Sequence, residues 1–247
     1  MADTEQLNEL SLEVKHLHAT QNIHLFKDFY ANATDGFGEL ELLCDEYGSD
    51  KGSQHIYASH AYSWIPHTYT QIYNYLFAPI RKDVKFLFEC GVGTNNENLI
   101  SNMGMRYKPG ASLRVWRDYF KNIECVYGAD IDKDILFFED KIKTYYLDQT
   151  DKDSIFDYFK NIDNKNEYFD IMIDDGLHEA HAAISLFENS IRYLKNDGFY
   201  VIEDLALTSI HILHHYLKKY PKFETNYVVM GDKGYLGNNN LIVVKKH

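Results

Sequence analysis

The sequence predicts an α/β protein built around a mostly parallel sheet, and three features of the chain indicate this fold class. From Lys85 onward, short apolar runs alternate with longer segments of helical periodicity. A glycine-rich turn follows the first apolar run, and several runs end in acidic residues. Continuously apolar runs are typical of strands buried on both faces, as in a parallel sheet. A chain of 247 residues is long enough for one large domain of this kind with short extensions.

Seven apolar runs are the expected strands. In chain order they are KFLFEC, CVYGADI, KTYYLD, YFDIMIDD, GFYVIED, TNYVVM and NLIVVKK. Between the fourth and fifth runs, helical spacing from Ala180 to Leu194 ends before Asn196-Asp197-Gly198, which predicts a crossover helix with a glycine stop. The last two runs flank GDKGYLGNNN without a helix, so they are expected to pair as an antiparallel hairpin. The predicted sheet is therefore seven-stranded and Rossmann-like, with helices on both faces and an antiparallel last strand.

The chain is predicted to divide into an N-terminal helical extension with a lid, residues 1–80, and a main domain, residues 81–247. Residues 5–30 carry two short amphipathic segments that are expected to pack outside the main sheet or against another subunit. Two further helices are predicted, one over residues 36–47 that ends near Gly48 and one from about His67 to Phe77 that stops at Pro79.

Composition excludes several classes of protein. No run of about 18 apolar residues occurs, so a membrane span is excluded. The N-terminus, MADTEQLNEL, lacks the basic start and apolar core of a signal peptide. Three cysteines without paired spacing favour reduced thiols and a cytoplasmic location. A formal charge of −12 with no basic stripe argues against a nucleic-acid partner.

The glycine-rich turn ECGVGTNN (Glu89–Asn96) follows the first strand, and the segment ENLISNM after it has a helical pattern. Glycines let a backbone bend sharply and approach a ligand closely, although such a turn is often only a tight connection. Asn95-Asn96 replaces the third glycine of the dinucleotide fingerprint, which argues against NAD. An acidic residue two positions before the first glycine is instead typical of S-adenosylmethionine sites. The cofactor-binding residues predicted in this turn are Glu89, Gly91, Gly93 and Asn95.

Acidic residues also end the second and third strands. Asp130 is expected to accept hydrogen bonds from both ribose hydroxyls of the cofactor. The alternative is that Asp130 or Asp132 caps the following helix, and for Asp132 the cap is preferred. Asp148 either accepts from an adenine amino group or caps the helix DKDSIFDYF.

The fourth and fifth strands end in a larger acidic set. Asp175 follows the fourth strand, and Glu203 and Asp204 follow the fifth. Because the carboxyl ends of neighbouring parallel strands meet over the ligand crevice, these carboxylates are expected to converge. Three carboxylates without a cysteine suit a hard cation such as Mg²⁺. His178, three residues after Asp175, is close enough to share the site.

This constellation suits methyl transfer to a hydroxyl. The sulfonium is already reactive, whereas a neutral alcohol is a poor nucleophile. A bound metal lowers the pKa of the hydroxyl, and His178 then removes its proton, with Asp175 as its catalytic neighbour. The simpler alternatives are that Asp204 caps the helix LALTSIHILHHYLKK, that Asp175-Gly176 is only a turn, and that His178 is only a loop residue.

Several segments together resemble the macrocin and mycinamicin sugar O-methyltransferase family, which has the class I S-adenosylmethionine-dependent methyltransferase fold. They are YGSDKGS, HTYTQIYNYLF, FECGVGT, PGASLRVWRDYF, VYGADID, LDQTDKDS, FDIMIDDGLHEAH and YVIEDL, over roughly residues 45–207. PGASLRVWRDYF is a specific marker of this family, because it fills a longer-than-usual insert between the first and second strands.

The resemblance implies metal ligation by Asp175, Glu203 and Asp204, with His178 as general base. It implies that the cofactor contacts are Glu89, Gly91, Asp130, Asp148, Gln149 and Asp174. It also matches Lys51, His67 and Tyr69 to an upstream motif that closes over the cofactor or acceptor. The N-terminal part is too short for the helper domain of some macrolide enzymes, so a sugar, a nucleotide sugar or a phosphorylated metabolite is as plausible an acceptor as a macrolide.

The predicted function is therefore S-adenosylmethionine-dependent, Mg²⁺-assisted O-methylation of a sugar-like or phosphorylated small molecule, by a homo-oligomer. Three alternatives remain open at this point. One is an N-methyltransferase of the same fold without a metal, and another is a NAD-dependent sugar-modifying oxidoreductase. The third is a non-catalytic assembly subunit that has kept the fold.

Overall fold

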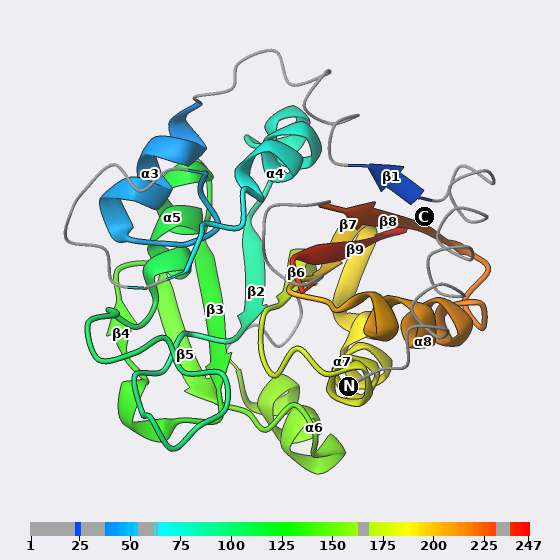
Figure 1. The fold of residues 1–247 in the computed structure, drawn as a ribbon. Coiled ribbons are helices and arrows are strands. Elements are labelled where there is room, and N and C mark those ends of the chain that lie inside the picture. The colour runs from blue at the N-terminus through cyan, green and yellow to red at the C-terminus, as the bar shows by residue number, and fades with distance from the viewer. Residues whose placement is uncertain (1–22, 26–37, 54–61, 63, 163–167, 231–237) are drawn as a thin grey trace.

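The computed structural model describes residues 23–25, 38–53, 62, 64–162, 168–230 and 238–247. In these residues nine strands form one sheet in the order β1-β8-β9-β7-β6-β2-β3-β5-β4 (Figure 1). The seven predicted strands occupy its seven central positions, so the predicted fold class is confirmed. They are β2 (Phe86–Cys90), β3 (Cys125–Asp130), β5 (Ile142–Tyr146), β6 (Phe169–Asp174), β7 (Leu194–Ile202), β8 (Phe223–Val229) and β9 (Asn240–Lys246).

The strand directions also follow the prediction. Strands β5, β3, β2, β6 and β7 pair in parallel, whereas β9 runs antiparallel to both β7 and β8. Every residue of β2 and β3 is buried, as expected of strands covered on both faces. The parallel strands therefore present their carboxyl ends at one edge, where the loops that follow them meet.

Two short edge strands were not predicted. Strand β1 (Ile23–Leu25) pairs parallel with β8, and β4 (Phe138–Glu139) pairs antiparallel with β5. The prediction that the segment containing Ile23–Leu25 packs outside the main sheet is therefore wrong for these three residues. Their backbone groups form hydrogen bonds with the free edge of β8. An unpaired strand edge can pair with a segment whose side chains follow a helical pattern, because the pairing uses backbone groups only. The rest of residues 5–30 lies outside the described residues.

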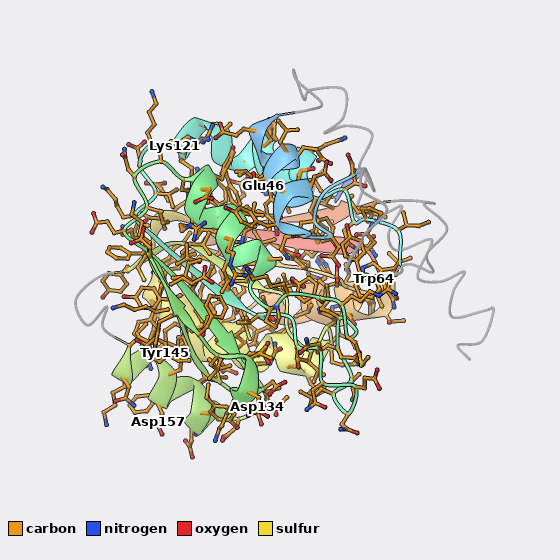
Figure 2. The ribbon with its side chains drawn as sticks, turned by 90° about the vertical axis from the view of Figure 1, so that its left-hand side faces the viewer. Glu46, Trp64, Lys121, Asp134, Tyr145 and Asp157 are labelled. Atoms are coloured by element: carbon orange, nitrogen blue, oxygen red, sulfur yellow. The ribbon has the colours of Figure 1, made fainter. Side chains whose placement is uncertain are left out.

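Helices cover both faces of the sheet (Figure 1). One buried cluster joins the sheet to α3 (Glu39–Tyr47), α4 (Thr70–Phe77) and α5 (Ala111–Tyr119). A second cluster joins the other face to α6 (Lys152–Asn161), α7 (Ala180–Ser190) and α8 (Leu207–Leu217). Figure 2 shows α3 and α5 side by side on their face. Short 3₁₀ turns lie at Ala78–Ile80, Lys133–Ile135 and Ile191–Tyr193.

Two predicted helices are confirmed close to their expected ends. Helix α3 ends at Gly48, whose φ of 74° is the left-handed conformation of a glycine cap. Helix α4 ends at Phe77, just before Pro79. It begins at Thr70 and not at His67, because Thr68 has a φ of 68° and cannot be part of a right-handed helix.

The predicted helix at ENLISNM is wrong. This segment forms turns, in which the side chain of Asn96 accepts a hydrogen bond from the backbone N–H of Asn98 (3.1 Å). An Asn that bonds its own backbone two residues on favours a turn over a helix. The crossover helix after β2 is α5, which the PGASLRVWRDYF segment forms.

The crossover helix before β7 is shorter than predicted. It ends at Ser190, and β7 already begins at Leu194 and continues through Asn196-Asp197-Gly198. A Cβ at Gly198 would lie 2.9 Å from the carbonyl oxygen of Asp170, next to a register shift in β6. The glycine therefore permits close approach of two strands and does not stop a helix.

The three cysteines are all described and buried, and no disulfide joins them. None of the described helices is long and apolar enough to cross a membrane.

Replacement of Gly91 by Ala tests the close approach of the glycine-rich turn to the end of β6. Gly91 has a φ of 96°, and a Cβ there would lie 1.9 Å from the carbonyl oxygen of Asp175. We expect Gly91→Ala to lower the free energy of unfolding by at least about 3 kcal/mol, measured by urea denaturation.

Gly104→Ala is the matched control, because Gly104 has a φ of 79° and no atom within 4 Å of the added Cβ. It should cost about 1–2 kcal/mol, from backbone strain alone. Equal losses in the two variants would contradict a steric role for the approach of Gly91 to Asp175.

Candidate active site

A cavity of about 620 Å³ lies at the carboxyl edge of the parallel strands. The turn after β2, the ends of β3 and β5, and the loop after β6 form one part of its wall. Residues 49–51, 64–67 and 238–239 form the remainder, together with Asp204 and part of the insert that precedes α5. The cavity therefore lies where the fold brings strand ends together.

Asp130 holds the glycine-rich turn and lines the cavity. One carboxylate oxygen accepts from the backbone N–H of Val92 (2.8 Å), and the other accepts from that of Asp132 (2.9 Å). Burial raises the pKa of Asp130, although these backbone hydrogen bonds act in the opposite direction. Each oxygen of a carboxylate has two lone pairs, so Asp130 can still accept hydrogen bonds from a ligand.

The helix-cap alternatives are resolved by the hydrogen bonds. Asp132 accepts from the backbone N–H of Asp134 (3.0 Å) and caps the 3₁₀ turn, as preferred from the sequence. Asp148 does not cap α6, because Asp151 holds that position and accepts from Asp153.

Gln149 connects the ends of β5 and β6. Its side-chain N–H donates to Asp174 (2.9 Å), and its side-chain oxygen accepts from the backbone N–H of Leu177 (2.7 Å). Burial raises the pKa of Asp174 to about 6, and the hydrogen bond from Gln149 limits this shift. Gln149 therefore orders the loop that carries Asp175 and His178.

Asp175, His178 and Asp204 converge at the cavity wall. His178 Nε2 lies 3.3 Å from Asp175 Oδ1 and 3.9 Å from Asp204 Oδ2, and one ligand atom from each residue lies within 4.8 Å of the others. His178 and Asp204 have φ values of 63° and 54°, a conformation that costs non-glycine residues free energy and is concentrated at functional sites. Helix α8 is capped at Ala206, so the alternative that Asp204 is its N-cap is wrong.

Lys51 inserts a buried ammonium among three carboxylates. Its Nζ lies 2.6 Å from Asp175 Oδ2, 2.6 Å from Glu203 Oε2 and 3.4 Å from Glu89 Oε1. We call these four residues the ammonium cage. Burial alone would lower the pKa of Lys51, but the charges of Asp175, Glu203 and Glu89 outweigh it and keep the amine protonated.

Neighbouring carboxylates also raise the pKa of His178. Burial opposes protonation of the imidazole, but the hydrogen bond to Asp175 and the charges of Asp204 and Asp175 raise the pKa of His178 to about 9. With only these residues around it, His178 is therefore a cation at neutral pH. It accepts a proton only when another positive charge offsets the carboxylates.

The upstream motif reaches the same place. His67 Nε2 lies 3.2 Å from Asp50 Oδ2, and His67 Nδ1 lies 3.5 Å from Asp204 Oδ1. The Tyr69 hydroxyl donates to Asp204. The segment before α4 therefore contacts Asp204 through His67 and Tyr69. The division of the chain into two parts at residue 80 stays a prediction.

Ten of the predicted site residues line the cavity: Lys51, His67, Gly91, Gly93, Asp130, Asp148, Gln149, Asp175, His178 and Asp204. Five others contact a lining residue but do not border the cavity themselves: Tyr69, Glu89, Asn95, Asp174 and Glu203. Asn95 does so through its side-chain N–H, which donates to the carbonyl of Tyr107 (3.4 Å).

Two site residues were missed from the sequence. Tyr73 donates its hydroxyl to Glu203, and Asp50 accepts from the indole N–H of Trp64 (2.8 Å) as well as contacting His67. Tyr73 follows Tyr69 by one helical turn, so the two side chains lie on one face of the helix. This spacing could have indicated that Tyr73 belongs to the same site as Tyr69. Asp50 is adjacent to Lys51, but nothing in the sequence pairs it with residues 64 and 67.

No family model matches the chain. The 8-demethyl-8-alpha-L-rhamnosyl tetracenomycin-C 2'-O-methyltransferase of Streptomyces olivaceus is 34% identical over 166 residues, which are 67% of this chain and 37% of that protein. The mycinamicin VI 2''-O-methyltransferase of Micromonospora griseorubida is 32% identical over 142 residues, which are 56% of this chain and 32% of that protein. The chain thus spans about a third of the length of these curated relatives.

A solved structure of the MycE methyltransferase from the mycinamycin biosynthetic pathway, in complex with Mg and SAH, matches with a TM-score of 0.58. It is 23% identical and the match covers 85% of this chain and 55% of that chain. Sheet order and this match define the class I methyltransferase fold. The curated relatives are sugar O-methyltransferases of macrolide and tetracenomycin pathways, and the resemblance inferred from the motifs is confirmed.

Glu89→Gln tests the cost of burying the Glu89 carboxylate in the ammonium cage. Burial raises the pKa of Glu89 to about 7 from its usual value of 4.5, against the lowering effect of Lys51. A carboxyl whose pKa is raised on folding stabilises the protein fully below its unfolded pKa, and this contribution is lost as the pH rises through the folded pKa. From the two pKa values the loss is on the order of 3 kcal/mol between about pH 4.5 and 8.

Gln cannot ionise, so the free energy of unfolding of Glu89→Gln should increase relative to wild type by this amount over the same pH range. Urea denaturation in EDTA measures it. Glu124→Gln is the control, because Glu124 is 55% exposed and pairs with Lys85 at the surface. Parallel pH profiles of wild type and Glu89→Gln would contradict the argument.

Proposed function

We propose that the chain is an S-adenosylmethionine-dependent O-methyltransferase that uses a divalent cation to methylate a hydroxyl of a sugar-like small molecule. The observation that carries this proposal is the convergence of Asp175, His178 and Asp204 on a cavity that also borders the glycine-rich turn. The names of the curated relatives, which are all O-methyltransferases, support the reaction class.

The residues of the cavity fit an adenosine-containing cofactor. The backbone at Gly91 and Gly93 borders the cavity without side chains, and Asp130 retains lone pairs for ribose hydroxyls. Asp148 lines the cavity beside Ile131 and Leu147, so it offers a carboxylate acceptor next to an apolar surface. An adenine ring has an amino donor and two apolar faces, which match this combination.

The donor set at Asp175 and Asp204 fits a hard divalent cation. Both carboxylates have an oxygen at the cavity wall, and the spacing to His178 Nε2 is that of atoms around one ion. Such a cation, when bound, supplies positive charge that lowers the pKa of an acceptor hydroxyl. Asp175 and Asp204 would hold it, and carboxylate oxygens suit Mg²⁺ better than softer metals.

His178 is positioned to move the proton. Its Nε2 atom faces both carboxylates, so any positive charge between them weakens the interactions that raise the pKa of this imidazole. Neutral His178 then accepts the hydroxyl proton at Nε2, while the wall holds the hydroxyl in line with the methyl donor.

The cavity wall favours a neutral acceptor over a phosphorylated one. Among the described lining residues, five are aspartates, namely Asp50, Asp130, Asp148, Asp175 and Asp204. Lys51 is the single lysine or arginine among them, and its ammonium is bound by carboxylates. Trp64, Asn238 and Asn239 add an aromatic surface and neutral amides. A neutral glycoside with free hydroxyls fits this wall.

His178→Asn tests the base. Asn tolerates the left-handed backbone at this position and removes the imidazole. We expect kcat to fall about 100- to 10,000-fold, whereas the affinity for S-adenosylhomocysteine changes less than about threefold. Methyl transfer to a panel of neutral glycosides, followed by mass spectrometry, and calorimetric titration measure the two quantities. Wild-type turnover in this variant would remove His178 from the mechanism.

Metal removal tests the cation. EDTA should lower methyl transfer by at least about 100-fold without changing the affinity for S-adenosylhomocysteine, and Mg²⁺ should restore it. If activity is complete in EDTA, the carboxylates only accept hydrogen bonds, and an N-methyltransferase becomes the better proposal.

A further inference from the structure

Trp64 borders the cavity with a side chain whose orientation is fixed by two contacts. Its indole N–H donates to Asp50 Oδ2 (2.8 Å). The indole also stacks on the ring of Tyr62, with 5.3 Å between the ring centroids and 30° between the ring planes. The nitrogen is the only polar atom of an indole, and Asp50 binds it. What Trp64 presents to the cavity is therefore aromatic carbon.

A chain of contacts connects Trp64 to the side of the cavity that carries the proposed base. The oxygen of Asp50 that accepts from Trp64 also lies 3.2 Å from His67 Nε2. His67 Nδ1 lies 3.5 Å from Asp204 Oδ1, and Asp204 Oδ2 lies 3.9 Å from His178 Nε2. Trp64 is therefore held to the part of the wall where the acceptor hydroxyl is expected, and not to the glycine-rich turn.

Two asparagines just before β9 add neutral amides to this part of the wall. The side-chain N–H of Asn239 donates to the carbonyl of His67 (3.1 Å), and its side-chain oxygen lies 3.2 Å from His67 Nδ1. Asn238 is exposed and borders the cavity, and its amide can both donate and accept hydrogen bonds. The aromatic carbon of Trp64 thus shares the wall with neutral polar groups.

A pyranose ring has surfaces that match these groups. Its two faces carry C–H bonds with small positive charges, whereas its equatorial hydroxyls project from the rim. The face of an aromatic ring is negative, so it attracts a C–H face of the sugar. The rim hydroxyls of a ring stacked on Trp64 then project along the wall, where amides can bind some of them and His178 can accept the proton of another.

We propose that Trp64 is the stacking surface for the acceptor, on which one C–H face of a neutral pyranose ring lies, and that a hydroxyl at the rim of this ring is methylated. This inference rests on the proposed function and deepens it, because it concerns the acceptor of the same cavity. Trp64 contacts the sugar ring and none of the reacting atoms. It is therefore a binding residue that determines which acceptors are used.

Saturation-transfer difference NMR tests the stacking without methyl transfer. The full chain, with S-adenosylhomocysteine and Mg²⁺, is mixed with methyl glycosides of neutral hexoses and 6-deoxyhexoses. The ring protons on one face of a bound glycoside should receive the most saturation, because that face lies against the protein. Equal saturation of both faces, or no binding by any glycoside of the panel, overturns the inference.

Two substitutions separate stacking from the hydrogen bond to Asp50. Trp64→Phe keeps an aromatic face and loses the N–H donor, whereas Trp64→Leu keeps an apolar side chain and loses the aromatic face. The affinity for the glycoside should fall less than about threefold in Trp64→Phe and at least about tenfold in Trp64→Leu. Equal affinities in the two variants overturn the inference, because Trp64 then acts through its N–H or as apolar bulk only.

Phe138→Leu is the matched control for loss of an exposed aromatic ring. Phe138 lies in β4, is 67% exposed and does not border the cavity. This variant should bind the glycosides with the affinity of wild type. A loss of affinity equal to that of Trp64→Leu would overturn the assignment of the stacking surface to Trp64.

Tryptophan fluorescence gives a second measurement, because the chain has two tryptophans. Trp116 is fully buried, whereas Trp64 borders the cavity. A bound glycoside should therefore protect the emission of wild type from quenching by acrylamide, and this protection should be lost in Trp64→Phe, where only Trp116 remains. Unchanged quenching by acrylamide with a glycoside bound overturns the inference.

Kinetics separate this inference from the proposed function. For a methylated glycoside, Trp64→Leu should raise KM at least about tenfold and change kcat less than about threefold. Glycosides that stack on Trp64 but receive no methyl group would contradict the proposed function and leave the stacking surface intact. Methylated glycosides whose KM is unchanged in Trp64→Leu would overturn the stacking surface and leave O-methylation intact.

Discussion

The site depends on one electrostatic constraint, which is that a single buried ammonium faces three carboxylates from neighbouring strand ends. Lys51 contacts Glu89 near the end of β2, Asp175 after β6 and Glu203 after β7. Removing charges from water costs several kcal/mol per ion unless a partner compensates, so the cage is stable only with the amine in place. Burial raises the pKa of Glu89 to about 7 even though the Lys51 ammonium lowers it, so one ammonium does not fully compensate the burial of three carboxylates.

The sheet makes this arrangement possible because parallel strands end at one edge. The register of β2 with β6 places Cys90 opposite Asp174, so the residues around them are brought together without any long loop. Gly91 lets the turn after β2 pass against the carbonyl of Asp175. Left-handed backbone at His178 and Asp204 then directs both side chains to the same wall. Packing of the sheet therefore compensates the local strain at these two residues.

Much of the fold was predictable from the sequence, because continuous apolar runs identify doubly covered strands and acidic strand ends identify the crevice. What failed depended on tertiary contacts. Strands of two or three residues, such as β4, have too few positions for a pattern. Asn96 and Gly198 act through local turns and close strand approach, which periodicity does not report. In the site, the convergence of Asp175 and Asp204 followed from topology. The partner of Glu203 did not, because Lys51 lies 152 residues away and its burial is not visible in a motif.

The ammonium cage also bears on why a histidine serves as the proposed base. His178 has a pKa of about 9 beside unneutralised carboxylates, so the surplus negative charge keeps it protonated in the absence of another cation. In the proposed function, Asp175 and Asp204 would hold a divalent ion, which would offset that surplus and supply the positive charge that lowers the pKa of the acceptor hydroxyl. The imidazole of His178 would then lose its proton under the same condition that lowers the pKa of the acceptor hydroxyl. Asp175 contacts both the Lys51 ammonium and the His178 imidazole, so the charge balance at this one carboxylate links the buried ammonium to the protonation of the proposed base.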